Sequence, residues 1–568
     1  MFTSLSLLVS GMGQTAVPAP ALRLPNVLGD HMVVQRDTPL PIWGWGEPGE
    51  TVRVTGLGVS REARVAPDGT WQVKLPAPKV GLPIEIGVSD GETAITLTDV
   101  LVGDVWVCSG QSNMQWSLAS AMNAAKELAN ANQPRIRLAL VPNVGADQPQ
   151  ADVATQWTIC NPTTAAGFSA VGYFFGRALM ESEGVPIGLI GTSWGGTPAE
   201  SWTPRQELVD SPLLRPMIKA YEVAKIENRE KIREYERAVE VRKQRNTDNG
   251  PAELAKGWEA PELAATDWKA IQLPALIENL GMAIDGAVWF RKEIEVPASW
   301  AGKPLVLKLG AIDDHDTTFW NGQKVGATGP DTPNAYATPR EYKVPDTAVS
   351  AGTVTIAIRL FDEVGNGGFS GTPDSMTLTE HDSGQSVSLA GEWKCRIERA
   401  IDPQVTQLPL QPMGPGNPWA PTNLYNAMIH PFVKFPIKGA IWYQGESNAG
   451  RYDEYRTLLP AMINGWRRAW GTKFPFLIVQ LANFMERNST PVDSDWARLR
   501  EAQNYTAQVL PNTQVAVTID IGDANDIHPR NKQDVGGRLA LAARETVYRS
   551  TKMGLSPMYD RMEVKGDR

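Results

Sequence analysis

The chain of 568 residues contains little cysteine and little histidine for its length. Its three cysteines are far apart in sequence, which excludes a disulfide-rich scaffold and a cysteine-based zinc site. The five histidines include no pair at metal-ligand spacing, so we expect neither a metal ion nor a cofactor. A general base that works near neutral pH would come from these five: His31, His315, His381, His430 and His528.

The sequence also lacks an excess of basic residues and any long hydrophobic run. Its net charge of −9 gives no basic footprint, so we expect neither a nucleic-acid partner nor attachment to an anionic membrane. No apolar run reaches the ~20 residues that a membrane-spanning helix needs. The length predicts several domains, and the oligomeric state stays undetermined.

Residues 1–23 have some features of a leader. An apolar run at 5–9 is followed by small residues at 15–21, although no Lys or Arg precedes Arg23. A tail that stays on the protein would look similar. We expect export, and therefore a periplasmic or secreted protein.

Two stretches show the short alternating strands of β domains. Residues 24–98 predict an N-terminal β-sandwich, and residues 257–398 predict a second β domain. Within the second, residues 312–326 resemble the sugar-binding jelly-roll domain found beside the catalytic barrel of β-galactosidase-type glycosidases. Between the two lies a charged, glycine-free stretch at 214–245, which predicts a solvated connecting helix.

Ser112 lies where a predicted buried strand, residues 101–108, gives way to a helical pattern. Apolar residues recur there at three- and four-residue steps from Met114 to Leu128, which predicts a helix. The first N–H groups of a helix have no partners within it. A serine at this turn can therefore act as a nucleophile and contribute its own N–H to an oxyanion hole. Simple capping of the helix is the structural alternative.

Buried strands alternate with helices again after residue 420, which predicts a parallel sheet covered on both faces. Together with residues 99–256, residues 399–568 would complete this α/β domain, so that 257–398 form an insertion. Ligand sites in such sheets form outside the carboxyl ends of the strands. The polar signals expected at that edge are Ser112, Gly195, Gly196, Gln444 and His528.

Three ordered blocks carry a family resemblance: GQSNM at 110–114, WYQGESN at 442–448 and DIHPRNKQ at 526–533. They resemble the signature blocks of the sialate O-acetylesterase family, over roughly 24–250 and 420–550. The resemblance implies an SGNH-type hydrolase fold and a serine esterase that removes O-acetyl groups from sugars without a cofactor. Family members continue past the last block into further β structure, which leaves open whether the sequence is shortened at its C-terminal end.

For this reaction Ser112 is the expected nucleophile and His528 the expected base, with His430 as the competing histidine. The oxyanion hole would comprise the Ser112 N–H, a glycine N–H at Gly195 or Gly196, and the Gln444 side-chain amide.

The acid that orients His528 is less clearly indicated. SGNH hydrolases usually place Asp three residues before the histidine, where this chain has Asn525. We expect Asp526 to orient the ring; Asp523 and Asp520 lie further back, and a backbone carbonyl is a further alternative.

Two other functions stay open at this stage. The 19 tryptophans and two β domains would suit a catalytically inactive glycan-binding protein. A glycosidase is less well supported, because it needs a pair of carboxylates that we do not find at strand ends. The expected partner is an acetylated glycan, either sialic acid or a plant-type polysaccharide or oligosaccharide.

Overall fold

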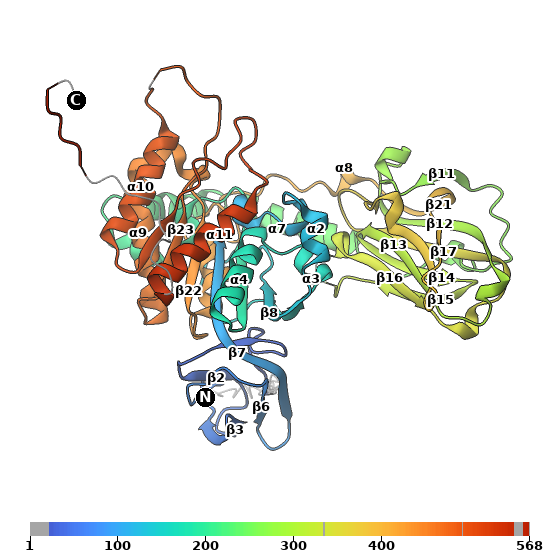
Figure 1. Ribbon diagram of the computed structural model, residues 1–568, viewed down its shortest axis with the longest axis horizontal. Helices are drawn as coiled ribbons and strands as arrows, with labels where there is room; N and C mark the ends of the chain where they lie inside the picture. Colours follow the sequence, from blue (N-terminus) through green and yellow to red (C-terminus); the bar gives the residue numbers. More distant parts are fainter. Residues whose placement is uncertain (1–21, 333–334, 491, 550–560, 567–568) are drawn as a thin grey trace, which may run out of the picture.

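The structure is a computed structural model that describes residues 22–332, 335–490, 492–549 and 561–566. The predicted leader lies almost wholly outside these residues, so export stays a prediction. Three parts follow one another in space: a small β domain, a sheet covered by helices, and a second β domain to one side (Figure 1). Within the described ranges, no helix has both the length and the apolar character to cross a membrane.

A mainly parallel sheet forms the centre of the molecule, which confirms the predicted mixed α/β class. Its strand order is β24–β23–β22–β7–β10–β8–β9, and only β9 runs antiparallel to its neighbour. The sheet joins strands from both sides of the inserted segment. Their bounds are β7 Ala94–Gly110, β8 Gln133–Leu140, β9 Trp157–Cys160, β10 Ile187–Ser193, β22 Gly439–Tyr443, β23 Phe476–Val479 and β24 Thr513–Ala516.

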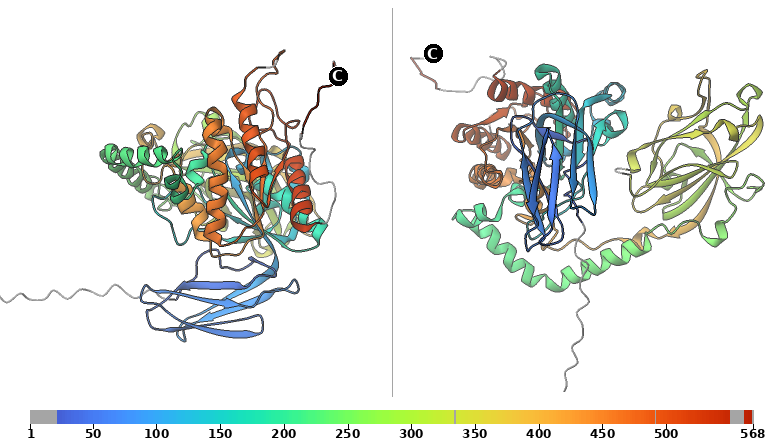
Figure 2. Two further views of the ribbon diagram at one scale, coloured as in Figure 1. Left: turned by 90° about the vertical axis from the view of Figure 1, so that its left-hand side faces the viewer. Right: turned by 90° about the horizontal axis from the view of Figure 1, so that it is seen from below.

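Helices cover both faces of this sheet, as the buried strands require. Helices α4 (Ala170–Glu183) and α11 (Lys532–Ala543) pack on each other on one face. Helices α9 (Tyr452–Trp470) and α10 (Asp495–Val509) cover the other (Figure 2). The chain winds to one side of β7 with β8 and β10 and to the other side with β22 to β24, so β7 is the switch point where a crevice is expected.

Strand β7 also joins the central sheet to the N-terminal β domain. Its first half pairs antiparallel with β6 (Ile84–Ser89), and its last residues pair parallel with β10 and β22. The predicted boundary at residue 98 therefore falls inside one continuous strand. The remaining strands are β1 Val33–Gln35, β2 Leu40–Trp45, β3 Thr51–Gly56, β4 Val59–Arg64 and β5 Thr70–Leu75.

The predicted helix after Ser112 is wrong. Only one turn forms, α1 (Ser112–Gln115), followed by a 3₁₀ turn (Leu118–Ser120) and the short α2 (Ala124–Ala129). Ser117 is extended and bridges Ser169, and Asn123 has a φ of 60°, so the chain bends twice instead of continuing one helix. Tertiary contacts override the helical periodicity here.

The inserted segment forms two antiparallel sheets around a separate hydrophobic core. One sheet has the order β11–β21–β12–β17–β14–β15, with strands Lys269–Leu273, Gly391–Ile401, Asp285–Val296, Gly352–Asp362, His315–Trp320 and Gln323–Thr328. The other has the order β16–β13–β19–β20, with strands Pro339–Val344, Leu305–Asp313, Met376–Glu380 and Ser386–Ser388, and β18 (Gly368–Phe369) pairs with β13.

The connector leading into this segment is two helices rather than one. Helices α6 (Arg215–Glu227) and α7 (Arg229–Arg245) meet at Asn228, and α7 buries none of its side chains. Figure 2 shows α7 running along the molecule from the central sheet towards the inserted domain.

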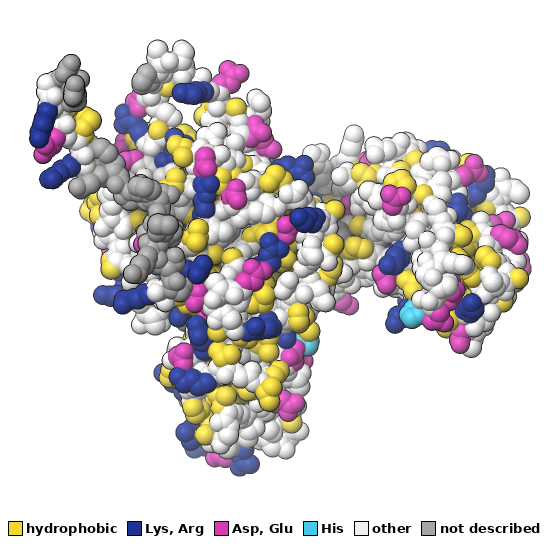
Figure 3. Space-filling view, viewed as in Figure 1, with side chains coloured by type: hydrophobic (Ala, Val, Ile, Leu, Met, Phe, Trp, Pro, Cys, Tyr) yellow, Lys and Arg dark blue, Asp and Glu magenta, His cyan; other side chains and the backbone are white. Residues whose placement is uncertain are grey.

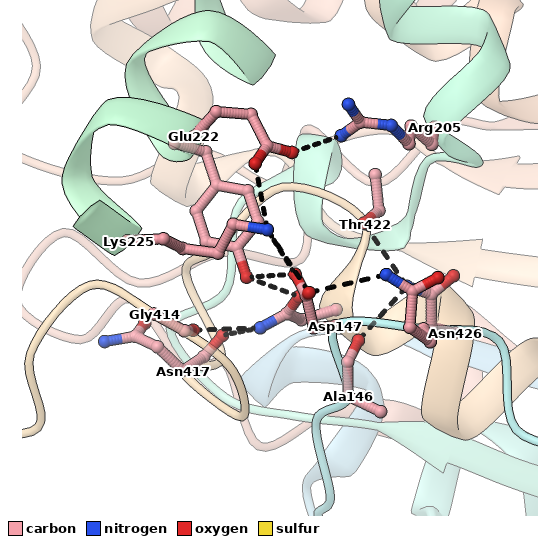
Figure 4. Close-up of polar contacts among 12 residues, drawn as sticks. Ala146, Asp147, Arg205, Glu222, Lys225, Gly414, Asn417, Thr422 and Asn426 are labelled. Carbon is pink, nitrogen blue, oxygen red and sulfur yellow. Dashed lines mark hydrogen bonds and ion pairs between the residues drawn. The ribbon is translucent and has the colours of Figure 1, made fainter. Parts of the chain in front are cut away.

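A polar network joins the chain segments that lead into and out of the inserted domain (Figure 4). Asp147, in the loop after β8, accepts hydrogen bonds from Tyr221 Oη at 2.7 Å and from Lys225 at 3.2 Å, both on α6. On the returning segment, Asn426 donates to the Ala146 carbonyl at 3.1 Å, and the Asn423 N–H groups hold Gly414 and Asn417. The segments through which the chain leaves and re-enters the central domain are therefore held together by these hydrogen bonds.

Candidate active site

Ser112 follows the central strand of the parallel sheet. The strand ends at Gly110, whose φ is 143°, and a methyl group built there would lie 2.1 Å from the Tyr443 carbonyl oxygen. Only glycine allows this close approach of β7 to the end of β22. Ser112 is the first residue of α1, so its N–H has no partner within the helix.

His528 lies beside Ser112, although 416 residues separate them in sequence. Its Nε2 is 2.8 Å from Ser112 Oγ, a hydrogen-bonding distance for a base and its nucleophile. His430, the competing histidine, instead places Nδ1 2.9 Å from the Gln150 carbonyl oxygen. The structure thus brings together the serine and the histidine of two separate sequence blocks.

The bent segment after Ser112 holds the loop that carries His528. The Trp116 ring stacks on the imidazole, with ring centroids 5.1 Å apart and planes 17° apart. Further along, the Met122 N–H donates to the Arg530 carbonyl at 2.8 Å, and Arg530 Nε donates to the Ser120 carbonyl at 3.1 Å. These contacts explain why a straight helix would not fit here.

Of the three candidate acids, Asp526 faces the ring. Its Oδ1 lies 3.6 Å from His528 Nδ1 and accepts the His528 backbone N–H at 2.8 Å. Asp523 accepts the Asn525 N–H, and Asp520 pairs with Arg538 at 2.6 Å. The Asp526–Nδ1 distance is longer than a hydrogen bond, so the ring is oriented without a short carboxylate contact.

The surroundings of His528 favour its neutral form. Partial burial lowers the pKa of its imidazole, and the charge of Lys532 lowers the pKa further, while Asp526 acts in the opposite direction. A neutral imidazole is the form that can accept the serine proton.

Two of the predicted oxyanion donors lie at the end of β10. A methyl group built at Gly195 would be 3.3 Å from Ser112 Cβ, so this glycine adjoins Ser112. Its N–H donates to Gln115 Oε1 at 2.8 Å. Gly196 is exposed, with a φ of 73°.

Gln444, the third predicted oxyanion donor, does not have a free N–H. Its Nε2 donates to Asn448 Oδ1 at 2.6 Å and to the Thr197 carbonyl at 3.3 Å, and its Oε1 accepts from Tyr455. The side chain is fully buried. In this arrangement Gln444 braces the loops after β10 and β22, because burial forces its amide to satisfy its hydrogen bonds within the protein.

Sequence reasoning assigned no role to several side chains that surround the pair: Asn113, Gln115, Trp116, Glu446 and Lys532. Two of them, Asn113 and Lys532, are almost completely buried, with 2% and 0% of their surface exposed. Lysine is seldom fully buried. The one hint that the sequence offered was the position of Lys532, in the last signature block and at the start of a predicted helix. Within the described residues, no group of three or more His, Cys, Asp or Glu could hold a metal ion.

Comparison with known proteins adds the family. The model of the carbohydrate esterase, sialic acid-specific acetylesterase family (SASA) matches residues 102–233 and 414–545, on either side of the inserted domain. The sialate O-acetylesterases of Rattus norvegicus and Homo sapiens are each 26% identical, over 93% and 95% of this chain and 73% and 74% of theirs.

A solved structure agrees. A carbohydrate acetylesterase from Xanthomonas citri superposes with a TM-score of 0.56 and 28% identity, over 95% of this chain and 78% of that one. The chain is therefore similar to the sialate O-acetylesterases in sequence and to a carbohydrate acetylesterase in structure. Both matched segments contribute to the site, because Ser112 lies in the first and His528 in the second. These similarities support O-deacetylation of carbohydrates as its reaction.

Proposed function

We propose that this protein is a serine esterase that removes O-acetyl groups from carbohydrates through an acyl-enzyme. The single observation that carries the proposal is the 2.8 Å approach of His528 Nε2 to Ser112 Oγ at the carboxyl edge of the central strand. A nucleophile and a base within hydrogen-bonding distance, beside unpaired helix N–H groups, are the parts that acyl transfer needs.

In the first half-reaction His528 accepts the Ser112 proton while Oγ attacks the acetyl carbonyl carbon. The tetrahedral intermediate then collapses: the bond to the sugar oxygen breaks, and the imidazolium returns the proton to that oxygen. In the second half-reaction His528 takes a proton from water as the water oxygen attacks the acetyl-serine. The bond from the acetyl carbon to Ser112 Oγ then breaks, the imidazolium returns the proton to Oγ, and acetic acid leaves and ionises to acetate in solvent. Each half-reaction returns His528 to its neutral form.

The oxyanion would be held by the N–H groups of Ser112 and Gly195, with Gly196 in the same loop. Gln115 Oε1 now accepts the Gly195 N–H, so an amide oxygen stands where a substrate oxygen would bind. The substrate carbonyl must displace this side chain, which is exposed. One oxyanion-hole donor contributes ~3 kcal/mol to the transition state.

Asp526 is proposed to stabilise the imidazolium once it forms. At 3.6 Å from Nδ1, with half of its side chain exposed, its charge acts at a distance and is partly screened. It would draw closer to the ring only when the histidine becomes charged.

We further propose an SGNH-type fold for the central domain and a jelly-roll-like fold for the inserted β domain. The parallel sheet with its active site after the first central strand supports the former, and the two antiparallel sheets support the latter. The substrate would be an acetylated sialic acid or a plant-type polysaccharide or oligosaccharide.

Hydrolysis of p-nitrophenyl acetate by wild type and by Ser112→Ala tests the proposal. We expect the substitution to lower kcat by about 10⁴-fold or more. The matched control is Ser117→Ala, which removes a hydroxyl that bonds only Ser120 at 3.0 Å, and we expect it to retain activity. Near-normal turnover by Ser112→Ala would refute the assignment, and acetate release from a panel of acetylated glycans would then define the substrate.

A further inference from the structure

Two buried charged groups lie behind the serine–histidine pair and meet through one amide. Lys532 Nζ donates to Asn113 Oδ1 at 2.5 Å, and Asn113 Nδ2 donates to Glu446 Oε1 at 2.6 Å. The other carboxylate oxygen of Glu446 is buried without a hydrogen-bond partner among the described residues. A buried ammonium and a buried carboxylate are costly to keep unless they are paired, and here the side chain of Asn113 forms the bridge.

The same amide reaches the histidine loop. Asn113 Nδ2 also donates to the Ile527 carbonyl at 2.9 Å, across 414 residues of sequence. Asn113 directly follows the proposed nucleophile, and Ile527 directly precedes His528. One side chain, held by charges at both of its ends, therefore ties the serine turn to the histidine loop.

Lys532 also touches the aromatic ring that stacks on His528. Its Nζ lies 5.8 Å from the centroid of Trp116 and 5.4 Å from that of Tyr443, within the range of cation–π attraction. Trp116 is the stacking partner of the imidazole. The ammonium thus supports the histidine through Trp116 as well as through Asn113.

We propose that Lys532, Asn113 and Glu446 are positioning residues that hold His528 against Ser112, an inference that rests on the proposed esterase function. The candidate acid cannot do this alone, because Asp526 is 3.6 Å from Nδ1 and half-exposed. The buried bridge behind the pair therefore holds the histidine loop in place, which is one of the two tasks of a closely bonded carboxylate in other serine hydrolases.

The bridge also sets the charge that His528 experiences. Burial lowers the pKa of Lys532 to about 7, against the opposing charges of Glu446 and Asp526. In the acid range, where His528 titrates, Lys532 is therefore mostly an ammonium. Burial is the main cause that lowers the pKa of His528; the charge of Asp526 raises it, and the smaller effect of the Lys532 charge lowers it. Removing the lysine charge should therefore raise the pKa of His528.

The test is the substitution Lys532→Met, which keeps an unbranched side chain only one atom shorter and removes its charge. The chain of 568 residues has five histidines, so labelled imidazole signals can be followed by NMR, with the His528 signal identified by its loss in His528→Gln. We expect the pKa of His528 to rise, because a nearby positive charge is removed. We also expect kcat to fall about tenfold, from the looser geometry, while KM changes little.

Arg467→Met is the matched control for loss of a buried cation. Arg467 is 6% exposed and donates hydrogen bonds to the carbonyls of Phe474 and Asn512. These carbonyls lie at the amino ends of β23 and β24, whereas Ser112 follows the carboxyl end of β7. We expect Arg467→Met to affect stability without moving the pKa of His528. Should Lys532→Met not fold, Glu446→Gln keeps the shape of the bridge and removes the carboxylate that raises the pKa of Lys532. We expect kcat to fall in this variant while KM changes little.

An unchanged pKa of His528 together with an unchanged kcat, in Lys532→Met or in Glu446→Gln if only that variant folds, would overturn the inference. An equal pKa shift in Arg467→Met would do the same. Labelling of the wild type by a fluorophosphonate tests the esterase proposal separately from the role of the bridge. Failure to label Ser112 would refute the esterase, while the NMR titration would still decide whether the bridge acts on His528.

Discussion

The two β domains are joined to the central sheet in different ways. The N-terminal domain shares strand β7 with the sheet, and a single hydrophobic cluster runs through both. The inserted domain has a core of its own, and a narrow connection joins it to the rest of the molecule above an open gap (Figure 3). A shared core makes two regions unfold together, whereas separate cores allow them to unfold independently.

Buried charges differ between the regions as well. In the inserted domain Arg340 and Asp316, both with fully buried side chains, pair directly at 2.8 Å, and Tyr342 also donates to Asp316. Beside the site, Lys532 and Glu446 meet only through Asn113. In the direct pair the two charges largely cancel each other, so they have little electrostatic effect on other groups. In the bridged pair the charges are further apart, so the charge of Lys532 still acts on His528.

The largest expected effect is on the free energy of unfolding. It tests whether the N-terminal and central domains share one hydrophobic core while the inserted domain has its own. Ile86 and Ile358 are both fully buried, the first in the N-terminal domain and the second in the inserted domain. Each substitution to Ala should cost about 2–5 kcal/mol of the free energy of unfolding. Ile86→Ala should lower the melting temperature of the central domain together with its activity. Ile358→Ala should lower only the transition of the inserted domain and leave hydrolysis of p-nitrophenyl acetate intact.

Calorimetry of both variants, with activity followed during heating, checks this contrast. If Ile358→Ala inactivated the enzyme as readily as Ile86→Ala, the inserted domain would be coupled to the site.

A second prediction concerns the candidate acid and its neighbour. Asp526→Asn removes the carboxylate that faces His528, and we expect kcat/KM to fall about tenfold, less than for a buried triad acid, because the charge is exposed. Asp523→Asn is the matched control, since its carboxylate only accepts the Asn525 N–H. Steady-state kinetics of the two variants decide between the two aspartates. A greater loss of kcat/KM in Asp523→Asn than in Asp526→Asn would assign the role to Asp523.

The smallest effect is on the pH profile. Since the pKa of His528 lies below its ordinary 6.5, the neutral base persists to lower pH, and the acid limb of kcat/KM should fall with a midpoint below 6.5. The inserted domain contributes no group to this titration, so Ile358→Ala should show the same midpoint. An acid limb above 6.5, or one that moves in Ile358→Ala, would contradict this separation of the two regions.

The sequence predicted the parallel sheet because its strands are short, continuous apolar runs that only a doubly covered sheet can bury. It also indicated Ser112 and His528 as candidates, since both lie in distinctive blocks, and the structure places them 2.8 Å apart. It did not predict the bends after Ser112: the apolar spacing indicated one helix, and the contacts of Trp116 and Met122 with the histidine loop decided otherwise. Gln444 was misread for a related reason, because a motif does not show where a side chain points.

By itself, then, the sequence determined which elements are buried and which residue types are available for acyl transfer, since hydrophobic periodicity and chemistry are local properties. Only the tertiary structure decided which groups meet. The approach of residues 112 and 528, the bridge from Lys532 through Asn113 to Glu446, and the separate core of the inserted domain all depend on contacts across hundreds of residues. Such contacts follow from strand order and packing, which local sequence patterns do not encode.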